Sequence, residues 1–122
     1  MDVQCRIKLP AKDRLPPGIE LTLFRIVQEA INNIEKYAHA KTARLQIGLQ
    51  NGHIRLKIQD DGRGFDPKKI KRDKKEKGHG LGLANMRERA LSLGGNCEIV
   101  SVPTKGTTIT VRIPYTNAAK PA

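Results

Sequence analysis

Apolar and polar side chains alternate in five short stretches of the chain. Alternation places every second side chain on one face of an extended backbone, so each stretch is predicted to be a β-strand. In the first stretch, Val3, Cys5 and Ile7 share a face, followed by Leu9. Asn51-Gly52, the strongest short-range signal for a hairpin, separates the second stretch from the third. The predicted strands are residues 3–9, 43–50, 53–59, 97–102 and 107–114.

Two other stretches repeat their apolar residues every three or four positions, which is the period of a helix that buries one side. The first helix is predicted over residues 20–38, after a segment with two prolines and a glycine that ends the first strand. Its apolar residues are Leu23, Val27, Ala30, Ile31 and Ile34. The second helix follows a glycine-rich stretch and stops at Gly94-Gly95. Its apolar residues are Leu83, Met86, Ala90 and Leu91.

The predicted order of elements is strand, helix, two strands, a long loop, helix and two strands. Neighbouring strands come in hairpins and the helices are few, which favours an α+β fold. We expect a two-layer sandwich, with a mixed, mostly antiparallel sheet and helices on one face. Residues 1–116 are predicted to form one domain, and residues 117–122 a disordered tail.

The formal charge of +11 and the isoelectric point of about 10.1 suggest a polyanionic partner. Aromatic residues make up only 3% of the chain, which argues against a stacking platform for single-stranded nucleic acid. Seven Lys or Arg residues and three acidic residues fall within residues 66–79, a composition typical of a solvated loop. No apolar run is long enough to cross a membrane, and Cys5 and Cys97 read as reduced thiols of a cytosolic domain.

Glycine recurs at alternate positions 78, 80 and 82, before the second helix. The spacing is neither that of the dinucleotide fingerprint nor that of a P-loop. Exposed N–H groups at a helix N-terminus favour anions, and glycine lets phosphate oxygens approach them. Taken alone, Gly78, Gly80 and Gly82 fit a phosphate site and a flexible hinge about equally well.

Glu29 and Asn33 stand four residues apart on the first helix, with Lys36 three residues further on. The α-helical period places all three on one stripe beside the apolar face. Carboxylate and carboxamide oxygens suit Mg²⁺, and a lysine could neutralise a phosphate. An ordinary solvated helix face is the better explanation of this pattern when it is taken alone.

Asp60 directly follows the third strand, with Gly62 and Gly64 behind it. A carboxylate at a strand end can accept a hydrogen bond from a purine amino group, while the glycines let the backbone come close to a flat ligand. The competing interpretation is a tight turn, which Asp and Gly form readily.

These motifs, together with Gly106-Thr107 before the last strand, resemble in order and spacing the ATP-binding domain shared by sensor histidine kinases, gyrase-type topoisomerases, MutL-type repair proteins and the Hsp90 chaperones (the GHKL superfamily). The match is best to the histidine kinases, in particular to the subfamily that includes the nitrate/nitrite sensors. The resemblance covers roughly residues 15–115 and implies a Bergerat-type fold with ATP between the helices and a mobile lid over residues 65–79. The lid would order around the nucleotide, with its glycines as hinge.

The resemblance also implies roles for individual residues. Asn33 would bind Mg²⁺ and Glu29 would hold a metal-bound water, the two being the catalytic pair. Asp60 would take the adenine amino group, helped by Thr107 through a water. The remaining ATP contacts would come from Lys36, Tyr37, Gly62, Gly64, Gly78, His79, Gly80, Leu81 and Gly82.

One residue departs from the family pattern, since Tyr37 stands where histidine often follows the lysine. Tyrosine can still donate a hydrogen bond to a phosphate. The implied function is a catalytic domain that binds Mg–ATP or ADP and passes the γ-phosphoryl group to a histidine on a separate dimerisation domain, which in turn serves a cognate response regulator.

We expect this chain to be a cytoplasmic monomer that does not phosphorylate itself, from a parent that could be membrane-anchored. Two alternatives remain open at this point. One is a stand-alone regulator, such as an anti-sigma-factor serine kinase. The other is a basic nucleic-acid-binding module, which has less support because the basic residues concentrate in the predicted lid and the motifs explain the glycines, so that no nucleic acid is expected as a partner.

Overall fold

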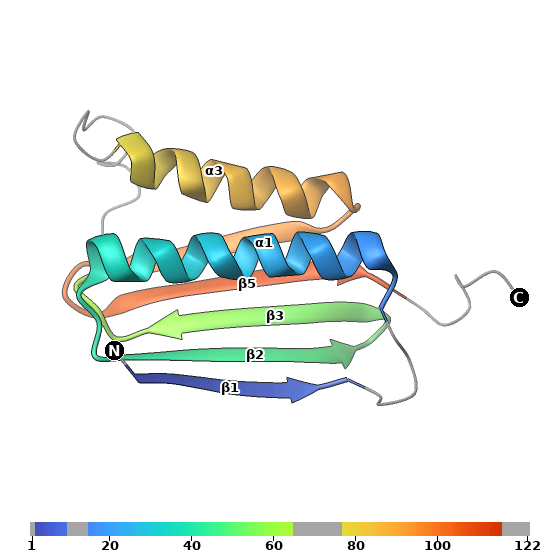
Figure 1. The fold of residues 1–122 in the computed structure, drawn as a ribbon, viewed down its shortest axis with the longest axis horizontal. Helices are drawn as coiled ribbons and strands as arrows, with labels where there is room; N and C mark the ends of the chain where they lie inside the picture. The colour runs from blue at the N-terminus through green and yellow to red at the C-terminus, as the bar shows by residue number, and fades with distance from the viewer. Residues whose placement is uncertain (1, 10–14, 65–76, 116–122) are drawn as a thin grey trace, which may run out of the picture.

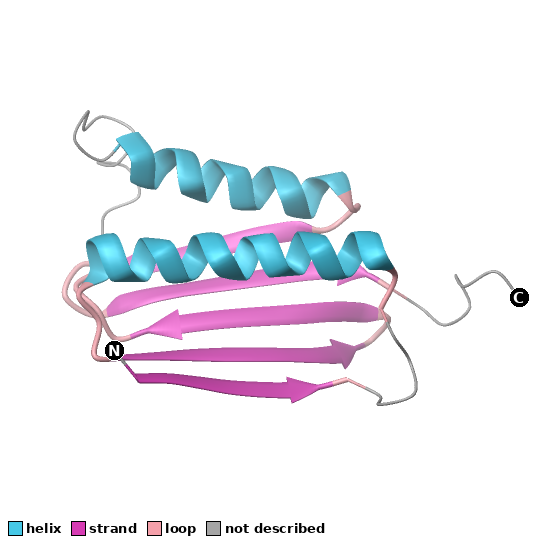
Figure 2. Ribbon diagram, viewed as in Figure 1, coloured by secondary structure: helices cyan, strands magenta, loops and turns pink. Residues whose placement is uncertain are grey.

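The computed structural model describes residues 2–9, 15–64 and 77–115, and for residues 77–81 it describes the backbone alone. Two long helices lie on one side of a single sheet (Figures 1 and 2). The strands are β1 (Asp2–Lys8), β2 (Thr42–Gln50), β3 (His53–Asp60), β4 (Asn96–Val102) and β5 (Gly106–Pro114). The helices are α1 (Pro17–Asn33), its continuation η1 (Ile34–Ala38) and α3 (Lys77–Ser92).

The five strands are ordered β1-β2-β3-β5-β4 in the sheet. β1 runs parallel to β2, and the other three neighbouring pairs are antiparallel. Asn51 and Gly52 connect β2 to β3 and both have positive φ, 51° and 75°, as a two-residue hairpin turn requires. The prediction of an α+β sandwich with a mostly antiparallel sheet is therefore confirmed.

The core lies between the helices and the inner face of the sheet. Ile54, Leu56 and Ile58 alternate along β3 and are at most 1% exposed. From the helices, Ile26 and Met86 reach the same core with 0% exposure. The helices pack against each other and over β3, β5 and β4, so most of their cover falls on this half of the sheet rather than on β1 and β2.

The ends of the predicted helices need correction. α1 begins at Pro17 rather than at residue 20, because proline fits the first helical position, where no N–H bond is needed. Residues 34–38 form a π-helical turn, which ends at His39 with a φ of 51°. Leu91, predicted on the apolar face of the second helix, is 64% exposed. The buried residues Met86 and Ala90 are four apart, and Leu91 lies one position off that stripe, close to the helix end.

The apolar face predicted for β1 forms, but its side chains are not buried. Val3, Cys5 and Ile7 are paired in register with β2 residues that face the helices. Val3 is nevertheless 48% exposed and Ile7 61%, because β1 is an edge strand that lies beyond the helices (Figure 1). Within the described residues, no helix has both the length and the apolar content to cross a membrane.

The two cysteines are free, as predicted. Cys5 lies in β1 and Cys97 in β4, at opposite edges of the sheet, about 19 Å apart at the usual strand spacing. A disulfide between them within one molecule is impossible at that separation. Burial raises the pKa of the Cys97 thiol to about 11, so this sulfur stays protonated and unreactive at neutral pH.

Candidate nucleotide-binding site

The predicted site residues gather at one end of the fold. α1 and α3 run in opposite directions, so the last turn of α1 lies at the same end as the first turn of α3 (Figure 1). β3 ends and β5 begins at this end too (Figure 1). Segments far apart in the chain thus lie together at this end of the sandwich. They carry Asn33, Gly82, Asp60 and Thr107.

Gly82 lies directly against the two candidate metal-binding side chains of α1. A Cβ atom at Gly82 would overlap Glu29 Oε1 and would lie 3.2 Å from Asn33 Nδ2 and 3.3 Å from Asn33 Oδ1. The Glu29 carboxylate and the Asn33 carboxamide thus lie directly against the backbone of Gly82, and a larger residue would fit there only if these side chains moved. The structure therefore places Gly82 of the glycine-rich motif beside Glu29 and Asn33, and the roles of these three residues in binding stay predictions.

Asn33 is a buried polar residue, only 8% exposed. Its Nδ2 atom is buried and has no hydrogen-bond partner among the described residues. Leaving a buried amide unpaired is costly, so this group is able to donate a hydrogen bond to a bound water or ligand. A carboxamide beside a carboxylate suits a hard cation with phosphates, so these residues fit Mg²⁺.

Lys36 and Tyr37 lie in the π-helical turn that follows Asn33. Such turns often occur at functional sites, and their i→i+5 hydrogen bonds make a wider turn than an α-helix. The α-helical spacing that placed Lys36 on the stripe of Glu29 and Asn33 does not apply there. Lys36 is exposed and Tyr37 half-buried, and their contacts with phosphate remain predictions.

Asp60, at the end of β3, belongs to the second part of the candidate site. It is 7% exposed, and its Oδ1 accepts a hydrogen bond of 2.8 Å from the backbone N–H of Gly62. The residue is paired in register with Thr107 of β5. Burial raises the pKa of the Asp60 carboxyl, against the opposing effect of hydrogen bonds from the backbone of Gly62 and Thr107.

The neighbouring carboxylate, Asp61, has a different environment that the sequence did not reveal. Its Oδ1 accepts hydrogen bonds of 2.9 Å from the backbone N–H groups of Lys41 and Thr42. Its Oδ2 accepts a bond of 2.8 Å from the Thr42 hydroxyl. These bonds, those from Thr42 first, hold the pKa of Asp61 below its usual value. Asp61 therefore ties the end of β3 to the start of β2.

The loop after Asp60 connects the two halves of the site. A Cβ at Gly62 would overlap the carbonyl oxygen of Ala38, the last residue of η1. That same oxygen accepts a hydrogen bond of 2.8 Å from the Arg63 N–H. Gly64 has a φ of 62° and packs against Val102. Both glycines are thus explained by close backbone packing, and their predicted contact with the base stays a prediction.

Thr107 is buried, 8% exposed, beside Asp60. Its Oγ1 lies 2.7 Å from the hydroxyl oxygen of Ser101 on β4. Ser101 was not predicted as part of the site, because only the pairing of β4 with β5 places residues 101 and 107 side by side.

The remaining predicted residues lie at the start of α3. Gly78, His79, Gly80 and Leu81 belong to its first turns, and their side chains are outside the described residues. The predicted lid falls mostly on residues 65–76, which are also outside them. Residues 77–79, the last part of that range, are helical rather than loop.

The fold is an α+β sandwich with a candidate nucleotide site at one end, and comparison with known proteins identifies its family. The family model described as histidine kinase-, DNA gyrase B-, and HSP90-like ATPase matches residues 18–117. The chain belongs to this family.

Two of the similar proteins are bacterial sensors. The sensor histidine kinase LiaS of Bacillus subtilis is 40% identical over 97 residues, which is 80% of this chain and 25% of LiaS. The sensor protein VraS of Staphylococcus haemolyticus is 42% identical over 101 residues, 83% of this chain and 27% of VraS. The chain thus spans about a quarter of the length of these relatives.

Solved structures show the same fold at low sequence identity. The histidine kinase domain of the Erythrobacter litoralis EL346 blue-light activated histidine kinase superposes with a TM-score of 0.70 and 18% identity, covering 92% of this chain and 54% of that one. A longer chain of that kinase gives a TM-score of 0.72 at 20% identity, covering 93% and 35%.

Proposed function

We propose that this chain is the ATP-binding catalytic domain of a sensor histidine kinase. It binds Mg–ATP and donates the γ-phosphoryl group to a histidine on a separate dimerisation domain. The observation that carries the proposal is the meeting of Gly82 with Glu29 and Asn33, at the same end of the fold as buried Asp60. The named relatives are sensor kinases, which favours this function over a serine-kinase regulator or a nucleic-acid-binding module.

In this proposal Asp60 recognises adenine. A carboxylate accepts up to about four hydrogen bonds, so the two backbone bonds it already accepts leave room for the adenine amino group. Burial strengthens such a bond, because water competes less for the carboxylate. The Thr107 hydroxyl, next to Asp60, would support the base through a water.

The phosphates would lie between α1 and α3. Asn33 and Glu29 would hold Mg²⁺, which supplies positive charge to the phosphate oxygens. The first turn of α3, with Gly78 and Gly80, would offer free backbone N–H groups and the positive end of the helix dipole, and Gly82 would let the phosphates come close to α1. Lys36 and Tyr37 would complete the phosphate contacts, together with His79 and Leu81 from the first turns of α3.

Phosphoryl transfer is mostly a matter of positioning and charge neutralisation. The bond between the γ-phosphorus and its bridging oxygen breaks, a bond from phosphorus to an imidazole nitrogen forms, and ADP leaves. This domain would hold the nucleotide, and the dimerisation domain would bring the histidine and then serve the response regulator. We propose that the chain is monomeric and works in the cytoplasm.

The test is calorimetric titration of ATP into the protein with and without Mg²⁺, with GTP as the matched ligand. We expect saturable ATP binding that strengthens with Mg²⁺ and much weaker GTP binding, because guanine carries a carbonyl where adenine carries the amino group. Transfer of label from γ-labelled ATP to the isolated dimerisation domain then tests the kinase step. Equal affinity for GTP and ATP, or no saturable binding of either, would contradict the proposal.

A further inference from the structure

The helix-free face of the sheet carries a basic groove, far from the nucleotide site. We call it the sheet groove, a hollow of about 440 Å³ over β1, β2 and β3. It lies toward the end of the fold where α1 begins, opposite to the end that carries Asp60 (Figure 1). Its lining residues are Arg6, Lys8, Gln46, Ile47, Gly48, Leu49, Gln50, Arg55 and Lys57.

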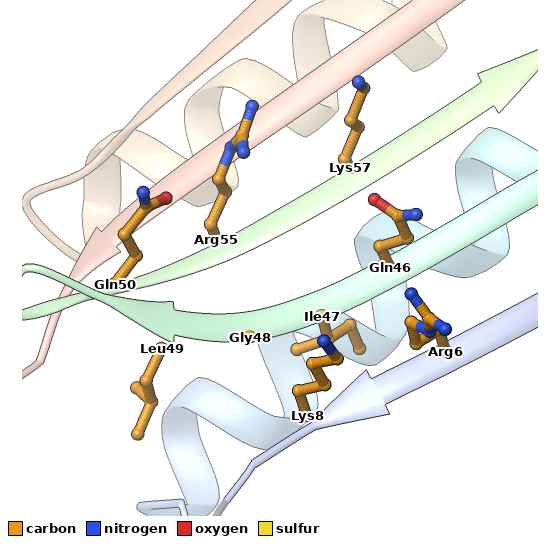
Figure 3. Close-up of a pocket in the computed structure, with 9 residues that line it drawn as sticks. All are labelled: Arg6, Lys8, Gln46, Ile47, Gly48, Leu49, Gln50, Arg55 and Lys57. Carbon is orange, nitrogen blue, oxygen red and sulfur yellow. The ribbon is translucent and has the colours of Figure 1, made fainter.

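The strand register arranges four cations as a frame around this hollow. Arg6 and Lys57 are both paired with Gln46, and Lys8 and Arg55 are both paired with Gly48. At ordinary sheet dimensions the frame measures about 7 Å along the strands and about 10 Å across them. Figure 3 shows the cationic side chains on the two strands that flank β2. Among the described residues, the lining contains no carboxylate to neutralise them.

Gly48 forms the floor of the sheet groove without a structural need for glycine. A Cβ there would lie 3.7 Å from the Lys8 carbonyl oxygen and 3.9 Å from Lys8 Cβ, which is ordinary contact. Glycine inside a strand costs stability, and it often marks a place where a ligand comes close to the backbone. Gly48 lies between Lys8 and Arg55, so its absent side chain leaves this side of the cationic frame open (Figure 3).

The sheet groove also contains polar groups that can form hydrogen bonds with a ligand. The Nε atom of Arg55 is buried and has no partner among the described residues. Gln46 and Gln50 extend from β2 on either side of Gly48 (Figure 3). Their carboxamides can donate and accept hydrogen bonds, as the main chain of a peptide requires. No aromatic side chain from the described part of the chain lines the groove, which disfavours single-stranded nucleic acid.

We propose that the sheet groove binds an extended acidic peptide segment of a partner protein. Alternate side chains of an extended peptide are about 7 Å apart, which matches the spacing from Arg6 to Lys8 and from Arg55 to Lys57. Carboxylates at alternate positions would meet these cations, and the peptide backbone would lie over Gly48 between Gln46 and Gln50. This binding does not depend on the nucleotide site.

The probe for this site is a fluorescein-labelled decapeptide of alternating Glu and Thr, followed by fluorescence anisotropy at low salt. Gly48→Val fills the floor with a residue that suits a strand, and Lys8→Gln/Lys57→Gln removes two cations from opposite sides of the frame. The matched control is Arg25→Gln/Arg87→Gln, which changes the net charge equally on exposed helix positions. Thermal melting of each variant checks that it folds.

We expect both groove variants to bind the peptide roughly five- to tenfold more weakly than the wild type, and the control variant to change less than twofold. Affinity for ATP should be the same in all four proteins, which separates this test from that of the nucleotide site. Equal weakening in the control would reduce the effect to net charge and overturn the proposal. Polyphosphate or single-stranded RNA that binds the groove more tightly than the peptide would also overturn it.

Discussion

The two halves of the nucleotide site are built in different ways. At the strand ends, Asp60 is held by the backbone of Gly62 and Thr107, and its carboxylate already has partners. Between the helices, Asn33 is just as buried, but its amide nitrogen has none among the described residues. Under the proposed assignment, the adenine half is preformed by the fold, whereas the phosphate half would be completed by its ligand.

The glycines of the two halves also differ, in the kind of atom that an added Cβ would meet. A Cβ at Gly62 would meet backbone atoms of Ala38, which cannot move without moving η1. A Cβ at Gly82 would meet the ends of the Glu29 and Asn33 side chains, which can rotate away. The first glycine thus serves folding and the second serves binding, and the variants below separate these roles.

Gly62→Ala should have the largest effect. The added Cβ overlaps a backbone carbonyl, so we expect the free energy of unfolding to fall by about 2–3 kcal/mol, with loss of ATP binding. Denaturation in urea measures this. The control is Gly18→Ala, in the first turn of α1, where a Cβ meets nothing within 4 Å and stability should be unchanged or higher. Equal stability of the two variants would contradict the packing of the loop on η1.

Asp60→Asn should lower ATP affinity by about ten- to a hundredfold, because a hydrogen bond to a charged acceptor is replaced by one to a poor partner. Asp2→Asn, an exposed carboxylate on β1, is the matched control for charge and should leave affinity unchanged. Calorimetry measures both. Unchanged affinity in Asp60→Asn would remove the adenine contact from this residue.

The same variant tests the pKa of Asp60 without nucleotide. Burial raises this pKa above its unfolded value, so the stability it contributes is present at low pH and is lost as pH rises through the folded pKa. Asn does not ionise. Asp60→Asn should therefore be as stable as the wild type at neutral pH, or more stable, although it binds ATP poorly. A marked loss of stability would show that the carboxylate is structural.

Gly82→Ala should leave the fold nearly intact and change the metal dependence of binding. Moving Glu29 to another rotamer costs about 1 kcal/mol at most, so stability should hardly change. The displaced carboxylate should weaken ATP binding in Mg²⁺ by roughly tenfold, with little change in EDTA. Titrations in the two buffers measure this difference, with Gly18→Ala again as control. An equal loss in both buffers would place the defect outside the metal site.

Asp61→Asn should have the smallest effect. Hydrogen bonds lower the pKa of Asp61, so its contribution to stability is present above the unfolded pKa and is lost as pH falls through the folded one. We expect the melting temperature of the wild type to drop more than that of Asp61→Asn in this acid range. Thermal melts across that range, with Asp2→Asn as control, measure the difference. Parallel acid curves for Asp61→Asn and the wild type would contradict this role.

Much of the fold followed from local pattern. Alternation and the Asn51-Gly52 turn predicted the strands, and the three-to-four period predicted both helices. The π-helical turn escaped prediction because its apolar residues, Ile34 and Ala38, also fit an α-helix. The exposure of Ile7 escaped because a period shows which side chains share a face, but not whether a helix covers that face.

The sequence predicted which residue types belong to the candidate site better than it predicted how they are arranged in space. Glu29, Asn33 and Gly82 were singled out by spacing, and the antiparallel helices bring them together. The sequence could not show which of the two adjacent carboxylates, Asp60 or Asp61, would be open to a ligand, because they differ only in the neighbours that the strands provide. Pairing of Asp60 with Thr107 in the sheet makes the difference.

The most direct test of the two-half site is a crystal structure with a non-hydrolysable ATP analogue and Mg²⁺. It should place the adenine amino group within about 2.7–3.2 Å of the Asp60 carboxylate and the Asn33 oxygen at about 2.1 Å from the metal. The position of Asp60 should match the ligand-free structure, whereas Glu29 and Asn33 should reorient. Adenine bound away from Asp60, or a metal without Asn33, would contradict the site.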